Sequence, residues 1–468
     1  MAQVTPRSGH FGQLVIIGGS IGGSSLAGAV AAWFDRVVIV ERDSFEDRPA
    51  KRKGVPHAYH FHTLTPLGLR VLEDIFPLLT KEMRELGAPF VDPIKMVRQG
   101  TKAGFLPRRD SELRLLRATR PLLEWYLHKR TSAVPNVEYR TGLEAVGLIE
   151  ESGRIVGVRT RDPRDAISAV PADFVVDASG RGSRAPRWLA ELGYPAPEET
   201  VVNAHWGYAT TYVKVPSEWE PGDYGSISVA PKVDKGAGPA ASRGASLWRN
   251  ENDLVVVTAQ GNRRDYPPRD LEGMMEFVSS FGYDEFRGVL EAFQAVSPVE
   301  IWRSTANRRR KFSAVPRHLE GFAAMGDSVA AMNPVYGHGM TLAFVAAQKF
   351  REAVVAHIAS GGTGVLGLGQ RFQQSLEPTI DAAWALSTAS DFRVPGVEVN
   401  GKPYTYEPTE QSEYMDRVLA LATEDADLAL KYMETALLMR GPEWSRDEDL
   451  RAKVKADWDR LGSVAREP

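Results

Sequence analysis

The segment from Leu14 to Glu41, LVIIGGSIGGSSLAGAVAAWFDRVVIVE, constrains the fold of this chain more than any other. The apolar run Leu14–Ile17 predicts a strand that is buried on both faces of a sheet. A glycine-rich turn, small residues at helical spacing and a second apolar run at Val37–Val40 follow it. The segment therefore predicts a strand, a turn, a helix and a second parallel strand, the unit that begins a doubly wound α/β sheet.

The turn in this segment has the spacing of a dinucleotide site. Gly18 permits a tight turn, and Gly23 lets the helix pack closely on the strand. The first N–H groups of the helix and the positive end of its dipole favour a pyrophosphate. Glu41 ends the second strand, where it can accept hydrogen bonds from a ribose diol. Ser20 replaces the middle glycine of G-x-G-x-x-G and can donate to a phosphate oxygen.

Two other interpretations of the same residues stay open at this point. No charged residue occurs from Leu14 to Phe34, a length that could span a membrane, although glycines and serines dilute the hydrophobicity. Gly18–Gly22 also spells G-x-S-x-G, the nucleophile elbow of hydrolases. An elbow normally follows several strands, whereas this turn follows the first, and a hydrolase would leave Glu41 without a role.

Composition narrows the classes of protein. At 468 residues the chain is long enough for two or three domains, and a formal net charge of -3 gives no reason to expect nucleic acid as a partner. The absence of cysteine excludes disulfides and thiolate chemistry. The first residues lack the ordered regions of a signal peptide, so we expect a cytoplasmic protein.

The pattern of elements along the chain predicts three parts. The fold class is α/β, with a Rossmann-type dinucleotide domain made of residues 1–201 and 302–360. Residues 202–301, with strand-like runs at His205–Val215 and Ala245–Ala259, predict an inserted mixed β-sheet substrate domain, which residues 85–117 could join. Residues 361–468 predict a helical C-terminal region, too charged for a membrane span, with helices over Gly369–Ala389, Gln411–Met439 and Arg446–Leu461.

Two further motifs follow strands later in the chain. FVVDASGRGSRAPRWL ends a strand at Asp177 and enters a loop of small residues. GFAAMGDSVAAMNPVYGHGMTLA places Asp327 after a strand and forms a turn with Pro334, Gly337, Gly339 and Met340. A long helix is predicted from Gly337 to about His357. Each motif alone is a common kind of turn after a strand. The occurrence of both motifs, in this order, after a dinucleotide turn is much more specific.

With these motifs the chain resembles the single-component FAD-dependent monooxygenases, the aromatic hydroxylases and their epoxidase relatives, which share the para-hydroxybenzoate hydroxylase and squalene epoxidase type of fold. The resemblance implies that Asp327 bonds the ribityl chain of FAD and that Pro334–Gly339 aims a helix N-terminus at the flavin pyrimidine edge. Arg52–Val55 matches R-x-G-V, whose arginine contacts the pyrophosphate. Arg120 matches an arginine near the ribityl or phosphate groups, and Arg42, after Glu41, and Asp177 are further expected contacts of the cofactor.

The resemblance is strongest to flavin epoxidases of polyether and polyketide biosynthesis, such as those of the lasalocid and monensin pathways. The strings that carry it are RKGVPHAYHFH, DASGRGSRAPRWLAELGYPAPEE, RSTANRR, NPVYGHGM and DAAWALSTASD. His57 and Tyr59 depart from it, because those relatives tend to have glutamine and arginine there. His60 and His62 alternate along the chain, but without acidic or thiol partners we expect no metal.

The resemblance implies insertion of one oxygen atom from dioxygen through a flavin hydroperoxide, with NADPH or NADH as direct or indirect reductant. Epoxidation of an alkene in a hydrophobic polyketide or other natural-product intermediate is the first expectation. Aromatic hydroxylation and a flavin reductase that saturates isoprenoid double bonds are the alternatives, and a separate flavin reductase is a candidate partner. The W-x-W-x-I-P signature of halogenases is absent. We expect a largely apolar substrate pocket lined by Trp206, Tyr208, Tyr212, Trp248 and Tyr336.

Overall fold

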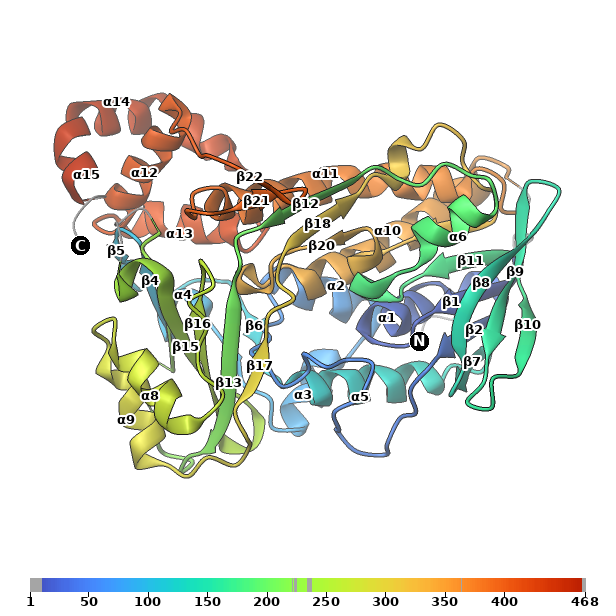
Figure 1. The fold of residues 1–468 in the computed structure, drawn as a ribbon, viewed down its shortest axis with the longest axis horizontal. Coiled ribbons are helices and arrows are strands. Elements are labelled where there is room, and N and C mark those ends of the chain that lie inside the picture. The colour runs from blue at the N-terminus through green and yellow to red at the C-terminus, as the bar shows by residue number, and fades with distance from the viewer. Residues whose placement is uncertain (1–10, 221, 223–224, 234–237, 363, 465–468) are drawn as a thin grey trace.

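The computed structural model describes residues 11–220, 222, 225–233, 238–362 and 364–464. Its first sheet has the strand order β19-β11-β1-β2-β7, with every neighbouring pair parallel. In that order the strands span Phe322–Ala324, Phe174–Asp177, Phe11–Ile17, Phe34–Glu41 and Val137–Thr141. Helices cover one face of this sheet, and a three-stranded antiparallel sheet covers the other (Figure 1). The prediction of an α/β fold with a Rossmann-type sheet is confirmed.

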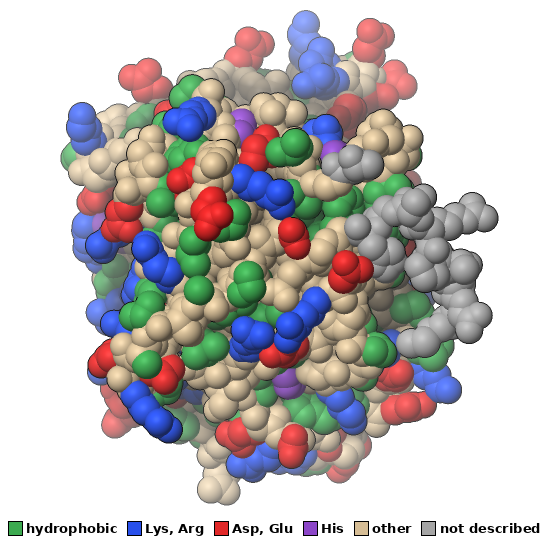
Figure 2. Space-filling view, turned by 90° about the vertical axis from the view of Figure 1, so that its right-hand side faces the viewer, with side chains coloured by type: hydrophobic (Ala, Val, Ile, Leu, Met, Phe, Trp, Pro, Cys, Tyr) green, Lys and Arg blue, Asp and Glu red, His purple; other side chains and the backbone are tan. Residues whose placement is uncertain are grey.

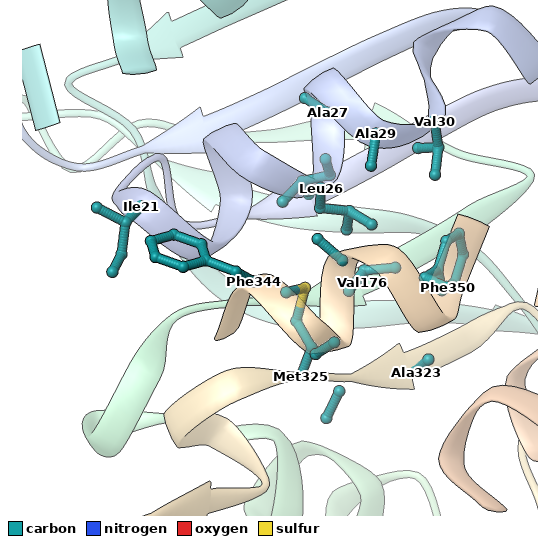
Figure 3. Packing of buried hydrophobic residues seen from close by; sticks show 14 of the residues in the cluster. Ile21, Leu26, Ala27, Ala29, Val30, Val176, Ala323, Met325, Phe344 and Phe350 are labelled. Carbon is teal, nitrogen blue, oxygen red and sulfur yellow. The ribbon is translucent and has the colours of Figure 1, made fainter. Parts of the chain in front are cut away.

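Helix α1 (Ile21–Val30) lies in the helical layer, packed against α10 (Gly339–Ala359). Figure 3 shows Leu26 of α1 gathered with Val176 of β11 and Phe344 of α10, all of them fully buried. A Cβ atom on Gly22 would lie 3.7 Å from the Cβ atom of Ala343, so small residues on both helices allow this close approach. The packing holds the first turn of α1 at the carboxyl end of β1.

A seven-stranded sheet with the order β17-β13-β16-β15-β14-β4-β5 forms the second part of the molecule (Figure 1). Helices α8 (Leu271–Ser279) and α9 (Asp284–Ala292) pack on one of its faces over an apolar core. Strands β4 and β5 come from an earlier part of the chain than the other strands. In sheet order the strands span Glu300–Trp302, Gly207–Lys214, Leu254–Gly261, Arg243–Arg249, Ser226–Val229, Val97–Thr101 and Gly104–Phe105.

The remaining elements connect and cover these sheets. The covering antiparallel sheet consists of Glu144–Glu151, Arg154–Arg161 and Ile167–Pro171 (β8–β10). A smaller five-stranded sheet has the order β20-β18-β12-β21-β22, formed by Ala330–Ala331, Asn307–Arg310, Glu199–Asn203, Glu398–Val399 and Lys402–Pro403. The other helices before residue 400 are α2 (Pro66–Ile75), α3 (Leu79–Glu85), α4 (Pro93–Met96), α5 (Arg120–Ser132), α6 (Ala185–Glu191), α7 (Pro239–Ser242) and α11 (Leu368–Asp391).

Several element boundaries differ from the sequence predictions. The long helix α10 begins at Gly339, not Gly337, because Gly337 has a φ of 73° and ends a short 3-10 turn over Pro334–Tyr336. The helix predicted over Gln411–Met439 is two helices, α12 (Glu410–Ala422) and α13 (Ala426–Ala436). The side chain of Asp425 accepts hydrogen bonds from two backbone N–H groups and so caps a new helix.

Two more predicted elements are shorter than expected. The last predicted helix is divided into α14 (Glu448–Ala456) and α15 (Trp458–Val464). The apolar ends of Leu113–Leu116 predict a strand, but the strand is only Leu115–Leu116 (β6), paired with β3 (Phe90–Val91).

The described surface carries charges of both signs. Figure 2 shows Lys, Arg, Asp and Glu side chains mixed over one face. No helix in the described ranges combines the length and apolar character needed to cross a bilayer.

Candidate functional site

A large cavity lies between the parallel sheet, the seven-stranded sheet and the C-terminal helices. Its volume is about 1580 Å³, more than the roughly 300–1,000 Å³ typical of a site for one small ligand. Its wall includes the glycine turn at one end and residues of α12 and α13 at the other. The cavity therefore has room for a dinucleotide together with a second molecule.

The glycine turn has the geometry that its sequence predicts. Gly18 has a φ of 100°, which strongly disfavours a residue with a side chain, and its N–H donates to the Val40 carbonyl at 2.9 Å. A Cβ atom on Gly23 would lie 1.9 Å from the Gly18 carbonyl oxygen. Gly18 and Ser20 line the cavity, whereas Gly23 does not, because its place is between the helix and the turn.

Glu41 and the loop that follows it form the next part of the wall. The Glu41 carboxylate accepts from the backbone N–H groups of Gly19 at 2.7 Å and Asp43 at 2.9 Å. A carboxylate has about four acceptor positions, so it can still bond a ribose. Arg42 and Val55 also line the cavity. The Val55 N–H donates to the Arg52 carbonyl, which fixes this loop beside the turn.

Arg52 and Arg120 converge on Glu124, a residue that the sequence patterns did not single out. Arg52 Nη2 lies 2.6 Å and Arg120 Nε 2.9 Å from the Glu124 carboxylate, which also accepts from the Ser20 hydroxyl. Burial raises the pKa of Glu124, but Arg120 and Arg52 outweigh it and lower that pKa to about 2. A buried glutamate thus holds both arginines and Ser20 at the turn. The only sequence signal was its position one helical turn after Arg120.

Asp177 organises a loop and does not line the cavity, which corrects the expectation that it contacts the cofactor. It is fully buried and accepts from the Ser179 N–H and hydroxyl and from the Ser183 hydroxyl. The loop that it fixes, Ala178–Gly182, does line the cavity. Arg181 in this loop was also missed by the sequence patterns; it donates to the carbonyls of Ala306 and Met332.

Asp327 faces the cavity beside the start of α10. Within the described residues, no hydrogen bond joins its carboxylate to another group, and burial raises its pKa. A Cβ atom on Gly339 would lie 3.7 Å from the Asp327 carboxylate, so the backbone here is close to the acid. Pro334, Gly337, Gly339 and Met340 line the same region. The Asp327 carboxylate, a hydrogen-bond acceptor, and the N-terminus of α10 therefore face the same part of the cavity.

Of the five aromatic residues expected to line the substrate pocket, four line the cavity and one does not. Trp206, Tyr208, Trp248 and Tyr336 line the cavity. Tyr212 does not line it, which corrects the expectation from period-two alternation. Its ring packs in a small core with Val256, Trp248 and Leu115 and contacts the Tyr59 ring edge-on. The sheet continues beyond the edge of the cavity, so the same face lines a pocket at Tyr208 and a core at Tyr212.

Asp391, the last residue of α11, connects the aromatic wall to the turn before α10. This fully buried carboxylate accepts from Trp206 Nε1 at 2.8 Å, Tyr336 Oη at 2.8 Å, Asn307 Nδ2 at 2.7 Å and Asn333 Nδ2 at 3.0 Å. All four donors are neutral, and burial raises the pKa of Asp391 to about 6. No local pattern marks this residue, because its partners come from distant segments.

The titration of Asp391 predicts a pH effect on stability. Its pKa is raised in the folded state, from 3.8 to about 6, so the folded protein binds the proton more tightly than the unfolded chain. Relative to Asp391→Asn, the wild type should therefore gain stability, on the order of 3 kcal/mol, as pH falls from about 7 to 4. Urea denaturation of both proteins across this range measures the difference. The exposed Asp381→Asn, on the same helix, serves as the control and should show no such gain.

Three histidines lie near the arginines. His57 and His62 line the cavity, and His60 bonds Thr210 at 2.9 Å. Burial lowers the pKa of His57 to about 3 and that of His60 to about 4, so both rings are neutral. Within the described part of the chain, no three His, Asp or Glu side chains form a cluster that could hold a metal ion.

Comparisons with solved structures agree on the fold. No family model matches the chain. Protein Rv3254 of Mycobacterium tuberculosis is 27% identical over 426 residues, which cover 89% of this chain and 87% of that protein. A flavoprotein/dehydrogenase from Cytophaga hutchinsonii superimposes with a TM-score of 0.65 at 15% identity, covering 97% of this chain and 98% of its own.

Two other solved structures are described by their activity. The flavin-dependent brominase Bmp2 gives a TM-score of 0.63 at 13% identity, covering 96% of this chain and 99% of its own. PqsL of Pseudomonas aeruginosa is described as a probable FAD-dependent monooxygenase. It gives a TM-score of 0.61 at 17% identity, covering 82% of this chain and 96% of its own. The chain thus has the fold shared by FAD-dependent monooxygenases and flavin-dependent halogenases.

Proposed function

We propose that this protein is an FAD-dependent monooxygenase that inserts one oxygen atom from dioxygen into a small molecule. The observation that carries the proposal is the convergence, in one cavity, of the glycine turn, the Asp327 carboxylate and the start of α10 with an aromatic wall from the second sheet. The turn and Asp327 lie far apart in the chain, and a hydrolase or a simple dinucleotide fold gives no reason for them to meet. The fold comparisons support the same assignment.

The residues present suit FAD. The N-terminus of α1, with Arg52 and Arg120, would hold the pyrophosphate, and Glu41 would bond the ribose. Asp327, whose carboxylate has no hydrogen bond within the described residues, would accept from the ribityl hydroxyls, and the start of α10 would face the flavin pyrimidine. The bound flavin supplies the redox chemistry with dioxygen. The chain orients the two ligands, and its aromatic wall excludes water from the space between them.

A variant of Asp327 tests the cofactor assignment. A hydrogen bond to a charged group is worth about 1.5–3 kcal/mol, so Asp327→Ala should weaken FAD binding roughly ten- to a hundredfold. Titration of the apoprotein with FAD, followed by flavin fluorescence, measures this dissociation constant. The exposed Asp381→Ala should leave it unchanged. Purified protein that is colourless and fails to bind FAD would contradict the proposal altogether.

For the reaction, we propose epoxidation of an alkene in a polyketide or other natural-product intermediate. The resemblance to polyether and polyketide epoxidases supports this, and the aromatic wall offers an apolar surface to an alkene. Aromatic hydroxylation fits the same geometry. Incubation with alkenes and phenols under ¹⁸O₂ separates the two, because the labelled product is an epoxide in one case and a phenol in the other. Product that forms only without oxygen would favour a flavin reductase acting on isoprenoid double bonds.

The reductant is a separate question. We propose NADPH or NADH as the electron source, supplied directly or through a partner flavin reductase. Anaerobic mixing of the FAD-loaded protein with NADPH should bleach the flavin absorbance within the time of turnover if reduction is direct. Bleaching that requires an added flavin reductase would assign the electron supply to a partner.

A further inference from the structure

The seven-stranded sheet carries a line of polar side chains on its cavity face. Its other face packs on α8 and α9 through apolar residues. On the cavity face, register places one polar residue beside the next across five strands. We call this line the hydroxyl row; it consists of Gln99 (β4), Ser228 (β14), Ser246 (β15), Thr258 (β16) and Thr210 (β13).

Three members of the hydroxyl row are buried, Gln99 and Ser228 are half-buried, and internal bonds satisfy the row only in part. The Ser228 and Ser246 hydroxyls bond each other at 2.9 Å, as do those of Thr210 and Thr258. Ser246 is 7% and Thr258 6% exposed. A hydroxyl has one donor and two acceptor positions, so the Ser228–Ser246 pair keeps one proton and several lone pairs free. Thr210 also bonds His60, so the Thr210–Thr258 pair keeps mainly lone pairs free. Leaving such groups unpaired in an apolar site costs about 1–3 kcal/mol each.

The row is neutral along its length. It contains only hydroxyls and an amide, and at its Thr210 end it meets His60, which burial keeps uncharged. The next residue in register is Glu300 of β17, whose carboxylate is paired with Lys51 at 3.1 Å. A charged ligand would find no counter-ion in the row, whereas neutral hydroxyl, ether or carbonyl groups could bond it without that cost.

Larger side chains flank the row on both sides. Trp248 lies at the neighbouring register on one side, and Tyr208 and Trp302 pair with each other on the other side. These three aromatic residues line the cavity, as do four members of the row, Gln99, Ser228, Ser246 and Thr258. The wall is thus a polar stripe with Trp248 on one side and Tyr208, Trp302 and the amide of Gln260 on the other. This differs from the apolar pocket that the sequence predicted.

We propose that the hydroxyl row is a substrate-recognition site for a neutral, oxygen-bearing molecule, whose hydroxyl, ether or carbonyl groups lie along the row while its carbon skeleton contacts the aromatic residues beside it. The proposal rests on the proposed function for the position of the substrate, and it excludes a plain hydrocarbon as the preferred ligand. It assigns selectivity to Ser246 and Thr258, which lie at the centre of the row.

Binding of a matched series of probes to the FAD-loaded protein tests this. Farnesene, farnesol and 12-hydroxyfarnesol share one skeleton and carry no, one and two hydroxyl groups. A net hydrogen bond is worth about 0.5–1.5 kcal/mol, so affinity should rise roughly two- to tenfold with each hydroxyl. In a Ser246→Ala, Thr258→Val double variant this rise should disappear, while farnesene binds as before or more tightly. Equilibrium dialysis gives the dissociation constants.

The control is Thr211→Val, which removes a buried hydroxyl from the opposite face of the same sheet, where it bonds the Ser297 carbonyl. It should leave the rise in affinity intact. Equal binding of the three probes by the wild type, or equal weakening of all three in the double variant, would overturn the proposal. Because binding is measured without turnover, a protein that discriminates among the probes but incorporates no ¹⁸O would refute the monooxygenase assignment and leave the recognition site standing.

Discussion

Replacing Glu124 with leucine should lower the free energy of unfolding by about 3–5 kcal/mol, the range for removing one partner of a buried ion pair. Arg52 and Arg120 are 8% and 5% exposed, and Glu124 accepts hydrogen bonds from both guanidinium groups. Leucine has a similar size but leaves Arg120 without its carboxylate and Arg52 with only the longer contacts to Glu41 and Asp43, at 3.5 and 3.6 Å. Urea denaturation measures the loss, and Glu124→Gln should recover part of it.

The effect of Glu124→Leu should depend on pH. The folded-state pKa of Glu124 is lowered from 4.5 to about 2, so its ionised form stabilises the fold above pH 4.5. This contribution is lost as pH falls towards 2, and the gap between wild type and variant should narrow there. Glu191→Leu is the control, because its pair with Arg187 is exposed and worth less than about 1 kcal/mol. A gap that is constant from pH 7 to 3 would contradict the assignment of the stabilisation to the charge of Glu124.

Replacing Gly23 with alanine should both destabilise the protein and weaken FAD binding. The added Cβ atom would lie 1.9 Å from the carbonyl oxygen of Gly18, and neither backbone segment can move without shifting α1 from β1. Overpacking of this kind costs about 1–3 kcal/mol and often more where backbone must move. The shift would also displace the N–H groups at the start of α1, so FAD affinity should fall in the fluorescence titration.

Gly288→Ala is the matched control for the change at Gly23. Gly288 also lies in a helix, α9, but a Cβ atom at this position would have no neighbouring atom within 4 Å outside its own helical backbone. Alanine should therefore stabilise that helix by up to about 1 kcal/mol and leave FAD affinity unchanged. Equal effects of the two substitutions on stability would show that the close contact at Gly23 relaxes without cost.

The sequence was most informative where chemistry depends on neighbours in the chain. Gly18, Gly23 and Glu41 lie in one strand–turn–helix–strand unit, whose local hydrogen bonds and packing follow from residue type and spacing. The turn at Gly337 also followed from local pattern, although the helix began two residues later than predicted, because a left-handed glycine ends one turn before another helix begins.

The sequence patterns did not identify the residues that act through partners far away in the chain. Glu124 gains its role from Arg52, 72 residues away, and Asp391 from Trp206, 185 residues away. A single carboxylate in a helix gives no sign of such partners, since burial and pairing depend on which elements pack together. The prediction for Tyr212 was wrong for the same reason, because alternation in a strand gives the face of the sheet but not where the cavity ends.

By itself, the sequence determined the α/β class and the dinucleotide turn, because backbone conformation and strand burial respond to local residue type. Only the tertiary structure decided that the cavity wall pairs aromatic residues with the hydroxyl row. Gln99, Ser228, Ser246 and Thr258 lie on four strands, and their alignment depends on a sheet register that joins β4 to β14, two strands far apart in the chain. Register is fixed by pairing between strands, so a line of polar side chains across a sheet exists only once the sheet has formed.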